Sequence, residues 1–154
     1  MKQEINISVD FAGVKLANPV FTASGTCGYA DELADFISVN QLGGFITKSI
    51  TAAPRKGNAV PRIVETDSGM LNAIGLANIG LDKFIEEKLP ILEKMSPAIF
   101  VNVAGQTIEE YTAVMERLVA EKAIAGFELN ISCPNVKKGG VSFGTDAGMV
   151  AEIT

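Results

Sequence analysis

The chain has 154 residues, 47% of them hydrophobic, so it can bury the core of one ordinary domain, and its composition excludes disorder. Its formal net charge of −5 argues against a nucleic-acid partner. The sequence contains no histidine, which excludes Ser-His and Cys-His nucleophilic pairs and most zinc sites. We therefore expect no metal site, and a general base must be Cys, Asp, Glu, Lys or Tyr.

Targeting signals are not evident in the sequence. Residues 1–4 are polar and no apolar segment of a secretory signal follows them. No apolar run approaches the roughly 20 residues that span a bilayer, so no membrane association is expected. Cys27 and Cys133 are then expected to be free thiols in a reducing cytoplasm.

The first third of the chain predicts a hairpin, two strands and a helix. Alternating apolar residues on either side of Ala12-Gly13 predict a short β-hairpin. Residues 20–22 predict a strand, and the small residues 23–28 after it would let a flat ligand approach the backbone, although a plain tight turn fits equally well. Residues 31–39 predict a helix, and residues 45–47 predict a second strand with Lys48 at its C-terminal end.

The middle of the chain contains a long segment, residues 51–76, broken by Pro and Gly. Such a loop in a compact domain is usually functional. Inside it, residues 62–65 and 70–71 are predicted to pair as small strands. Residues 81–95 predict a helix that Pro90 kinks or splits.

The last third predicts two further strand–helix units. Residues 98–101 form a strand followed by Asn102, and residues 107–110 form a capping box for the next helix. The buried stripe predicted for that helix is Ile108, Tyr111, Met115, Leu118 and Val119. Residues 126–130 predict a fourth strand, and a last helix begins near Thr145-Asp146.

The fourth predicted strand leads into a polar turn. Asn130, Ser132, Cys133 and Asn135 are polar or reactive groups within six residues, at a strand end where α/β proteins bind ligands. A packed strand end with an Asn-rich turn is the alternative interpretation.

A hairpin followed by four βα units predicts an α/β fold with a parallel sheet and helices outside it. No G-x-G-x-x-G follows the first strand, which disfavours a dinucleotide-binding Rossmann fold. In a (β/α)₈ TIM barrel, the polar residues after each strand would meet at one mouth. These residues are Ser24, Lys48, Asn102, Asn130 and Cys133.

With these residues in view, the sequence strongly resembles the N-terminal half of dihydroorotate dehydrogenases. The matching segments occur in the family's order and extend over essentially the whole chain. They are Ala23-Ser24-Gly25, Thr47-Lys48-Ser49, Asn72-Ala73-Ile74-Gly75-Leu76, Asn102-Val103-Ala104-Gly105 and Asn130-Ile131-Ser132-Cys133-Pro134-Asn135.

The resemblance implies FMN across the barrel mouth and FMN-dependent oxidation of dihydroorotate to orotate in pyrimidine (UMP) biosynthesis. Cys133 matches the catalytic base, which takes a proton from substrate C5 while a hydride leaves C6 for flavin N5. The implied FMN contacts are Ser24, Lys48, Ser49, Asn102 and Asn130. The implied substrate contacts are Lys48, Asn72, Ala73, Ile74, Gly75, Leu76, Asn130 and Asn135. The loop of residues 134–144 is expected to close over the site.

Residues 61–66 and 69–72 look most like the heteromeric, NAD-linked branch of the family. That branch implies an electron-transfer subunit carrying FAD and an iron–sulfur cluster, and a homodimer within a heterotetramer. The membrane-bound branch is disfavoured because its apolar N-terminal extension is missing.

A complete (β/α)₈ barrel has about 250 residues. Residues 1–154 are therefore expected to be the N-terminal half of a single FMN-binding TIM-barrel domain, with four βα units after the hairpin. A fragment of a longer enzyme is favoured over a non-catalytic half barrel, and the segment alone is expected to aggregate or dimerise, to bind FMN poorly and to be inactive. A flavin domain like that of dihydropyrimidine dehydrogenase is the alternative enzyme. Orotate binding would distinguish the two, because only a dihydroorotate dehydrogenase needs a site for the carboxylate.

Overall fold

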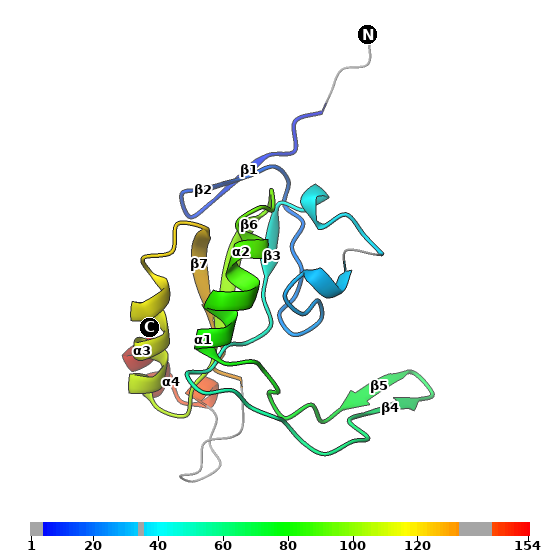
Figure 1. The fold of residues 1–154 in the computed structure, drawn as a ribbon, viewed down its shortest axis with the longest axis vertical. Coiled ribbons are helices and arrows are strands. Elements are labelled where there is room, and N and C mark those ends of the chain that lie inside the picture. The colour runs from blue at the N-terminus through cyan, green and yellow to red at the C-terminus, as the bar shows by residue number, and fades with distance from the viewer. Residues whose placement is uncertain (1–4, 34–35, 133–142) are drawn as a thin grey trace.

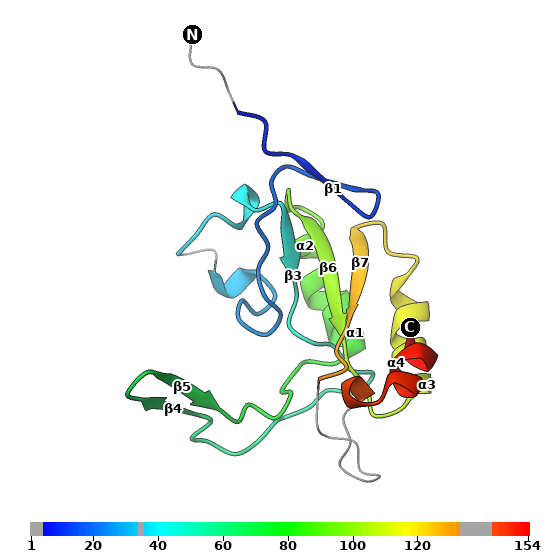
Figure 2. The same cartoon turned by 180° about the vertical axis from the view of Figure 1, so that it is seen from behind.

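The computed structural model describes residues 5–33, 36–132 and 143–154. Its centre is a three-stranded parallel sheet in the order β3-β6-β7, formed by β3 (Gly44–Ile46), β6 (Ala98–Val103) and β7 (Ile124–Leu129). Figures 1 and 2 show helices α1 and α2 against one face of this sheet and α3 beside β7. Parallel strands covered by helices are the arrangement expected of an α/β fold.

The central strand β6 contributes to both sides of the sheet. Ile99, Val101 and Val103 join the buried core formed with the helices, because alternate side chains of a strand share one face. Phe100 and Asn102 point to the opposite face, and both are buried as well. Burial on both faces explains why this strand is a continuous apolar run in the sequence.

The helix between β3 and β6 is interrupted, as Pro90 predicts. It consists of α1 (Leu81–Lys83), a π-helical turn η3 (Phe84–Lys88) and α2 (Leu89–Leu92). Proline has no N–H to donate to the preceding turn, so the wide turn lies directly before it. The helix ends at Leu92, three residues earlier than expected.

Thr107 is the N-cap of helix α3 (Ile108–Leu118), as predicted, but the return bond of the capping box is made to the residue before it. The Thr107 hydroxyl accepts from the Glu110 N–H at 3.3 Å, and the Glu110 carboxylate accepts from the Gln106 N–H at 2.6 Å. Tyr111, Val114 and Leu118 form its fully buried stripe. The prediction of Val119 in that stripe is wrong: it is 71% exposed, because it follows Leu118 by one residue and is rotated by about 100°.

The first predicted strand is reduced to a single bridge, between Phe21 and Gly44. The Thr22 hydroxyl accepts from the Ile46 N–H at 2.9 Å and lies 3.3 Å from the Ile46 carbonyl, to which it donates. A side chain therefore occupies backbone groups that a further ladder would use. The sheet consequently has three strands and a bridge rather than four complete strands.

The prediction of a helix over residues 31–39 is wrong. Two short 3-10 turns, η1 (Asp31–Leu33) and η2 (Val39–Gln41), take its place, and residues 34–35 lie outside the described residues. Leu33 packs against the core, but Phe36 is 82% exposed and Ile37 is exposed as well, so two residues of the expected apolar stripe pack little against the described residues. Helices of this length depend on such packing for most of their stability.

Two antiparallel hairpins lie outside the central sheet. Strands β1 (Val9–Phe11) and β2 (Val14–Leu16) pair around Ala12 and Gly13, which have φ of 50° and 88°. The Phe11 ring lies 5.6 Å from the Phe21 ring and 5.8 Å from the Phe100 ring, between centroids. This aromatic cluster ties the first hairpin to the sheet face opposite the helices.

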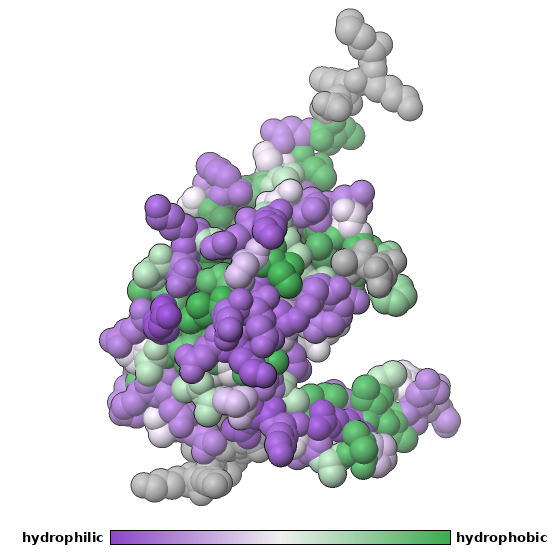
Figure 3. Space-filling view, in the orientation of Figure 1, coloured by the Kyte–Doolittle hydropathy of each residue, from purple (hydrophilic) through white to green (hydrophobic). Residues whose placement is uncertain are grey.

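The second hairpin forms an arm that projects from the body of the molecule (Figures 1 and 2). Strands β4 (Ile63–Thr66) and β5 (Gly69–Asn72) pair antiparallel, which confirms the small strands predicted inside the long loop. Figure 3 shows apolar side chains on its surface, and Ile63, Val64, Met70 and Leu71 are all more than half exposed. The arm therefore owes little of its position to burial.

The described chain ends in the helix α4 (Ala147–Ile153), which follows a 3-10 turn η4 (Phe143–Thr145). The Asp146 carboxylate caps α4 by accepting from the Met149 N–H at 2.9 Å, which confirms the predicted start of this helix. Across the described residues, none of the helices has the length and apolar character needed to cross a membrane.

Candidate functional site

A cavity of about 340 Å³ lies at the C-terminal ends of the parallel strands. Four separate parts of the chain line it: the loop after Phe21, the residues after β3, the loop after β5, and the residue after β7. The lining residues are Ser24, Gly25, Thr26, Lys48, Ser49, Asn72, Ile74, Gly75, Leu76 and Asn130. The size is within the range of small-molecule sites.

Main-chain and side-chain hydrogen bonds at the strand ends hold the inner wall of the cavity. The Lys48 N–H donates to the Gly28 carbonyl at 2.8 Å, and the Asn130 N–H donates to the Val103 carbonyl at 2.8 Å. The Asn130 amide donates to the Ser49 hydroxyl at 3.1 Å, and the Tyr111 hydroxyl donates to the Asn130 carbonyl at 2.6 Å. These side chains are therefore placed before any ligand arrives.

Lys48 is the cation of this cavity. Its side chain is half-buried, and among the described residues no carboxylate lies within ion-pair distance of its ammonium. Its hydrogen-bonding capacity is consequently available to an anionic or electron-rich ligand.

The outer wall is the loop of residues 72–76 at the base of the β4–β5 arm. Asn58 donates from its amide to the Ala73 carbonyl at 2.9 Å and from its backbone to the Ile74 carbonyl at 3.1 Å. The Asn78 amide donates to the Leu76 carbonyl at 2.9 Å. The β4–β5 ladder holds only the start of this wall, where Asn72 pairs with Ile63 and the Ala73 N–H donates to the Arg62 carbonyl at 2.8 Å. The amide side chains of Asn58 and Asn78 hold the rest.

Two residues of that loop have left-handed backbones. Gly75 has φ of 73° and Leu76 has φ of 57°. A Cβ added to Gly75 would lie 2.8 Å from the Asn58 backbone nitrogen, so only glycine fits there. A left-handed leucine is strained, and such strain is concentrated at ligand sites.

The loop after Phe21 presents backbone to the cavity. Gly25 has φ of 76°, and a Cβ built on it would meet no atom within 4 Å. The Thr26 hydroxyl turns back to the Ala23 carbonyl at 2.7 Å. The open side of Gly25 would let a flat ligand lie against the main chain.

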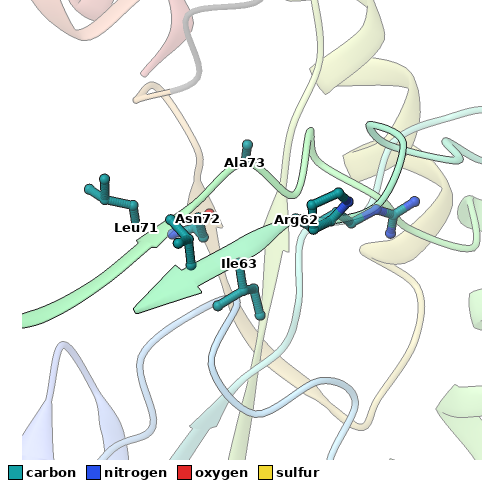
Figure 4. A pocket seen from close by; sticks show the side chains of 7 residues that line it. Arg62, Ile63, Leu71, Asn72 and Ala73 are labelled. Carbon is teal, nitrogen blue, oxygen red and sulfur yellow. The ribbon is translucent and has the colours of Figure 1, made fainter. Parts of the chain in front are cut away.

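Most of the predicted site residues meet at this cavity. Ser24, Lys48, Ser49, Asn72, Ile74, Gly75, Leu76 and Asn130 line it. Ala73 belongs to the same loop but lines a separate hollow of about 240 Å³ on the arm. In Figure 4, Leu71 and Asn72 lie on β5 with Ala73 directly after it, and Ile63 lies on β4 with Arg62 directly before it. Cys133 and Asn135 lie outside the described residues.

Asn102 is placed differently from the prediction of a cavity-lining side chain. It is 2% exposed and is absent from the cavity wall. Its amide nitrogen donates to Glu128 Oε1 at 2.5 Å, and its backbone N–H donates to the Thr47 hydroxyl at 3.2 Å. The Asn102 amide oxygen is buried and has no hydrogen-bond partner among the described residues.

Sequence reasoning did not select several residues that shape the site. Gly25 and Thr26 line the cavity, but neither was predicted as a ligand contact. Asn58 and Asn78 hold the outer loop. Glu128 was not selected either. The Pro- and Gly-rich character of residues 51–76 was a signal for the loop but not for its anchors.

Cys27 packs beside the site. It is half-buried against the core, and its sulfur lies 3.2 Å from the Thr26 hydroxyl. This position fits the packing role expected for it. Within the ranges that the structure describes, no cluster of three or more His, Cys, Asp or Glu side chains could hold a metal ion.

An ion pair ties the turn after the 23–28 loop to the helix between β3 and β6. The Lys88 ammonium bonds to the Asp31 carboxylate and lies 5.8 Å from the centre of the Tyr29 ring. Burial raises the pKa of Tyr29 to about 12. Burial also acts to raise the pKa of Asp31, but the hydrogen bond and charge of Lys88 outweigh it and hold that pKa below its usual value.

The sequence model of one family, described as dihydroorotate dehydrogenase, matches residues 6–154. The chain belongs to the dihydroorotate dehydrogenase family. This match extends over every element of the central sheet and all four parts of the cavity wall.

Individual relatives agree with the family. The chain is 52% identical over 148 residues to "Dihydroorotate dehydrogenase B (NAD(+)), catalytic subunit" of Geotalea uraniireducens, covering 96% of this chain and 48% of the relative. It is also 52% identical over 151 residues to the protein of the same name from Geobacter sp. (strain M21), covering 98% of this chain and 50% of the relative. The chain thus spans about half the length of the curated relatives it matches.

A solved structure supports the fold. DHODH from Eimeria tenella, crystallised in complex with ferulenol, superposes with a TM-score of 0.64 at 22% sequence identity. The superposition covers 89% of this chain and 39% of that one. The parallel sheet and its helices therefore correspond to part of the barrel of this family.

Proposed function

We propose that the full-length protein oxidises dihydroorotate to orotate, in pyrimidine biosynthesis, with FMN as its cofactor. The observation that carries this proposal is the cavity at the strand ends, where Lys48, Ser49 and Asn130 meet the loop of residues 72–76. Residues 1–154 then form the N-terminal half of one FMN-binding barrel domain.

The residues of the cavity fit a flavin. The open backbone at Gly25 suits a planar ring, and the hydroxyls and amide of Ser24, Ser49 and Asn130 can both donate and accept along its polar edge. Lys48 would hold the cofactor edge that becomes electron-rich on reduction. Asn102, which is buried near the C-terminal end of β6, is the fifth proposed FMN contact.

The substrate would lie between the cofactor and the outer wall. Its carboxylate needs cations and N–H donors, which Lys48 and the loop backbone offer, and its ring amides suit the side chains of Asn72 and Asn130. The left-handed backbone of Gly75 and the strained backbone of Leu76 would present this loop in its binding conformation. Ala73, Ile74 and Asn135 complete the proposed substrate contacts.

The proposed reaction separates a proton from a hydride. When bound, FMN supplies the acceptor for the hydride that leaves substrate C6. Cys133, as a thiolate, takes the proton from C5, because the described cavity wall offers no carboxylate or histidine for that task. Lys48 stabilises the negative charge that accumulates, and the loop of residues 134–144 excludes water.

The proposed electron route leaves this subunit. Similarity to relatives named NAD(+)-linked catalytic subunits supports a partner subunit that carries FAD and an iron–sulfur cluster and passes electrons to NAD. We propose a cytoplasmic heterotetramer built on a homodimer of the catalytic subunit. Copurification and NAD reduction by dihydroorotate would test this part separately.

The test uses the full-length protein loaded with FMN. Anaerobic addition of dihydroorotate is expected to bleach the oxidised flavin, whereas dihydrouracil, which lacks the carboxylate, is expected to have no effect. Bleaching by dihydrouracil alone would instead favour a dihydropyrimidine dehydrogenase. Bleaching by neither compound would refute both enzyme functions.

The role of Cys133 is tested by its replacement with serine. Cys133→Ser is expected to slow flavin reduction by about 100-fold or more and to shift its pH dependence upward, because a hydroxyl ionises much less readily than a thiol. Cys27→Ser is the matched control and should keep the wild-type rate, because Cys27 packs against the core. An unchanged rate and pH profile for Cys133→Ser would remove Cys133 as the base.

A further inference from the structure

The buried amide of Asn102 has one satisfied end and one unsatisfied end. Its nitrogen donates to the Glu128 carboxylate at 2.5 Å, whereas its oxygen is buried and has no partner among the described residues. A buried polar atom without a partner is costly, so proteins rarely leave one without a reason. The missing partner of this oxygen must be a hydrogen-bond donor.

The pairing of β6 with β7 explains why the amide is turned this way. Asn102 and Glu128 are direct partners in the parallel register, and both lie on the sheet face opposite the helices. A carboxylate oxygen accepts hydrogen bonds and an amide oxygen cannot donate one, so contact with Glu128 selects the amide nitrogen. The amide oxygen therefore points away from Glu128.

The surroundings of Asn102 connect it to the cavity. Its backbone N–H bonds to Thr47, the residue before Lys48, and its carbonyl accepts from the Ile50 N–H at 2.8 Å. The next residue of β6, Val103, accepts from the N–H of Asn130. Cavity-lining residues therefore follow β3 and β7, the two strands that flank Asn102 in the sheet.

Glu128 itself has no place in the cavity wall. Its half-buried side chain borders an apolar hollow of about 330 Å³ lined by Phe11, Phe21, Ile46, Phe100 and Phe127. An apolar side chain would pack better in this hollow than a carboxylate does. Its hydrogen bond to Asn102 is the contact that accounts for it.

We propose that Glu128 is a positioning residue that orients the Asn102 amide so that its oxygen accepts a hydrogen bond from bound FMN. The inference rests on the proposed function and adds to it the residue that determines which end of the Asn102 amide faces FMN. FMN offers two kinds of donor, the N3–H of the ring and the hydroxyls of the ribityl chain.

Replacement of Glu128 by glutamine tests the proposal, since glutamine has the same shape but can both donate and accept. In the full-length apoprotein, Glu128→Gln is expected to weaken FMN binding by about tenfold, because the Asn102 amide is free to reverse. Glu116→Gln, on the exposed face of α3, is the matched control and should bind FMN like the wild type. Fluorescence quenching of added FMN measures these affinities.

A double-mutant cycle separates positioning from a general structural role. If Glu128 acts through Asn102, the Glu128→Gln effect should disappear in an Asn102→Ala background. An equal loss in both backgrounds, or no loss from Glu128→Gln alone, would overturn the proposal. If Asn102→Ala does not fold, Asn102→Ser, which is small and polar, replaces it in the cycle.

N3-methyl-FMN identifies the donor without relying on Asn102 variants. A ring N3–H donor predicts that the wild type prefers FMN over N3-methyl-FMN and that Glu128→Gln loses most of this preference. A ribityl donor predicts an equal loss for both flavins, with the cycle still showing dependence on Asn102. A wild type that binds neither flavin would refute the proposed function itself, rather than this inference alone.

Discussion

The two walls of the cavity are held in place by different means. The inner wall follows strands β3 and β7 and inherits its position from a buried sheet, in which Phe45, Val101 and Val103 are fully buried. The outer wall lies at the base of the exposed β4–β5 arm and is held by amide side chains and by a glycine that no other residue can replace. Substitutions should therefore act on cofactor and substrate binding separately, according to the wall they affect.

The largest effect is expected from Lys48, because it is the cation of the described inner wall and is proposed to contact both FMN and the substrate. Lys48→Ala should slow anaerobic flavin reduction by dihydroorotate about 100- to 1,000-fold, which is the usual loss when one charge-stabilising group is removed. It should also weaken orotate binding. Lys83→Ala, an exposed lysine paired with Glu87, is the control. An unchanged orotate affinity would remove Lys48 from the substrate site.

The next largest effect compares a valine of the buried sheet with a valine of the arm. Val101 is 0% exposed and Val64 is 59% exposed. Val101→Ala should lower the free energy of unfolding by about 2 kcal/mol, whereas Val64→Ala should change it by less than about 0.5 kcal/mol. Urea unfolding of the full-length protein measures both. Equal losses would show that the arm is buried against another part of the assembly.

A smaller effect is expected from Gly75 of the outer wall, which is compared with a glycine of the arm. Gly75→Ala forces a left-handed alanine against Asn58 and should weaken orotate binding about tenfold, with FMN affinity unchanged. Gly69→Ala, at the start of β5, meets nothing closer than 4.0 Å and should leave orotate binding intact. A parallel loss of FMN and orotate in Gly75→Ala would mean that the two walls are not independent.

The smallest effect is expected at the edge of the inner wall, where Lys88 holds Asp31. Because the pKa of Asp31 is lowered in the folded state, its stabilising contribution is present above the unfolded pKa and is lost as pH falls through the folded pKa. Asp31→Asn should therefore be slightly less stable than the wild type at neutral pH and equally stable in acid. A stability difference that persists at low pH would mean that the ion pair is not its source.

The sequence predicted the parts of the fold that long patterns determine. The apolar run of β6 and the capped, amphipathic α3 lie where they were expected, because burial and capping act within one segment. The predictions of the first strand and of the helix after it were wrong, because Thr22 takes up backbone groups of Ile46 and Phe36 is exposed in the part of the chain that the structure describes. Neither fact can be read from residues 20–39 alone.

The site was predictable to a similar extent. Polar residues after strands pointed to one mouth, and most of them meet in one cavity. The burial of Asn102 was not foreseen, because it depends on the register that sets Glu128 opposite it. Asn58 and Asn78 were missed for the same reason: their partners are loop carbonyls whose positions only the folded chain defines.

The most direct test of the central claim is a crystal structure of the full-length protein with FMN and orotate bound. The account predicts flavin density against Gly25, Lys48 and Asn130, and orotate between the flavin ring and residues 72–76. Flavin or orotate bound away from this cavity would contradict it.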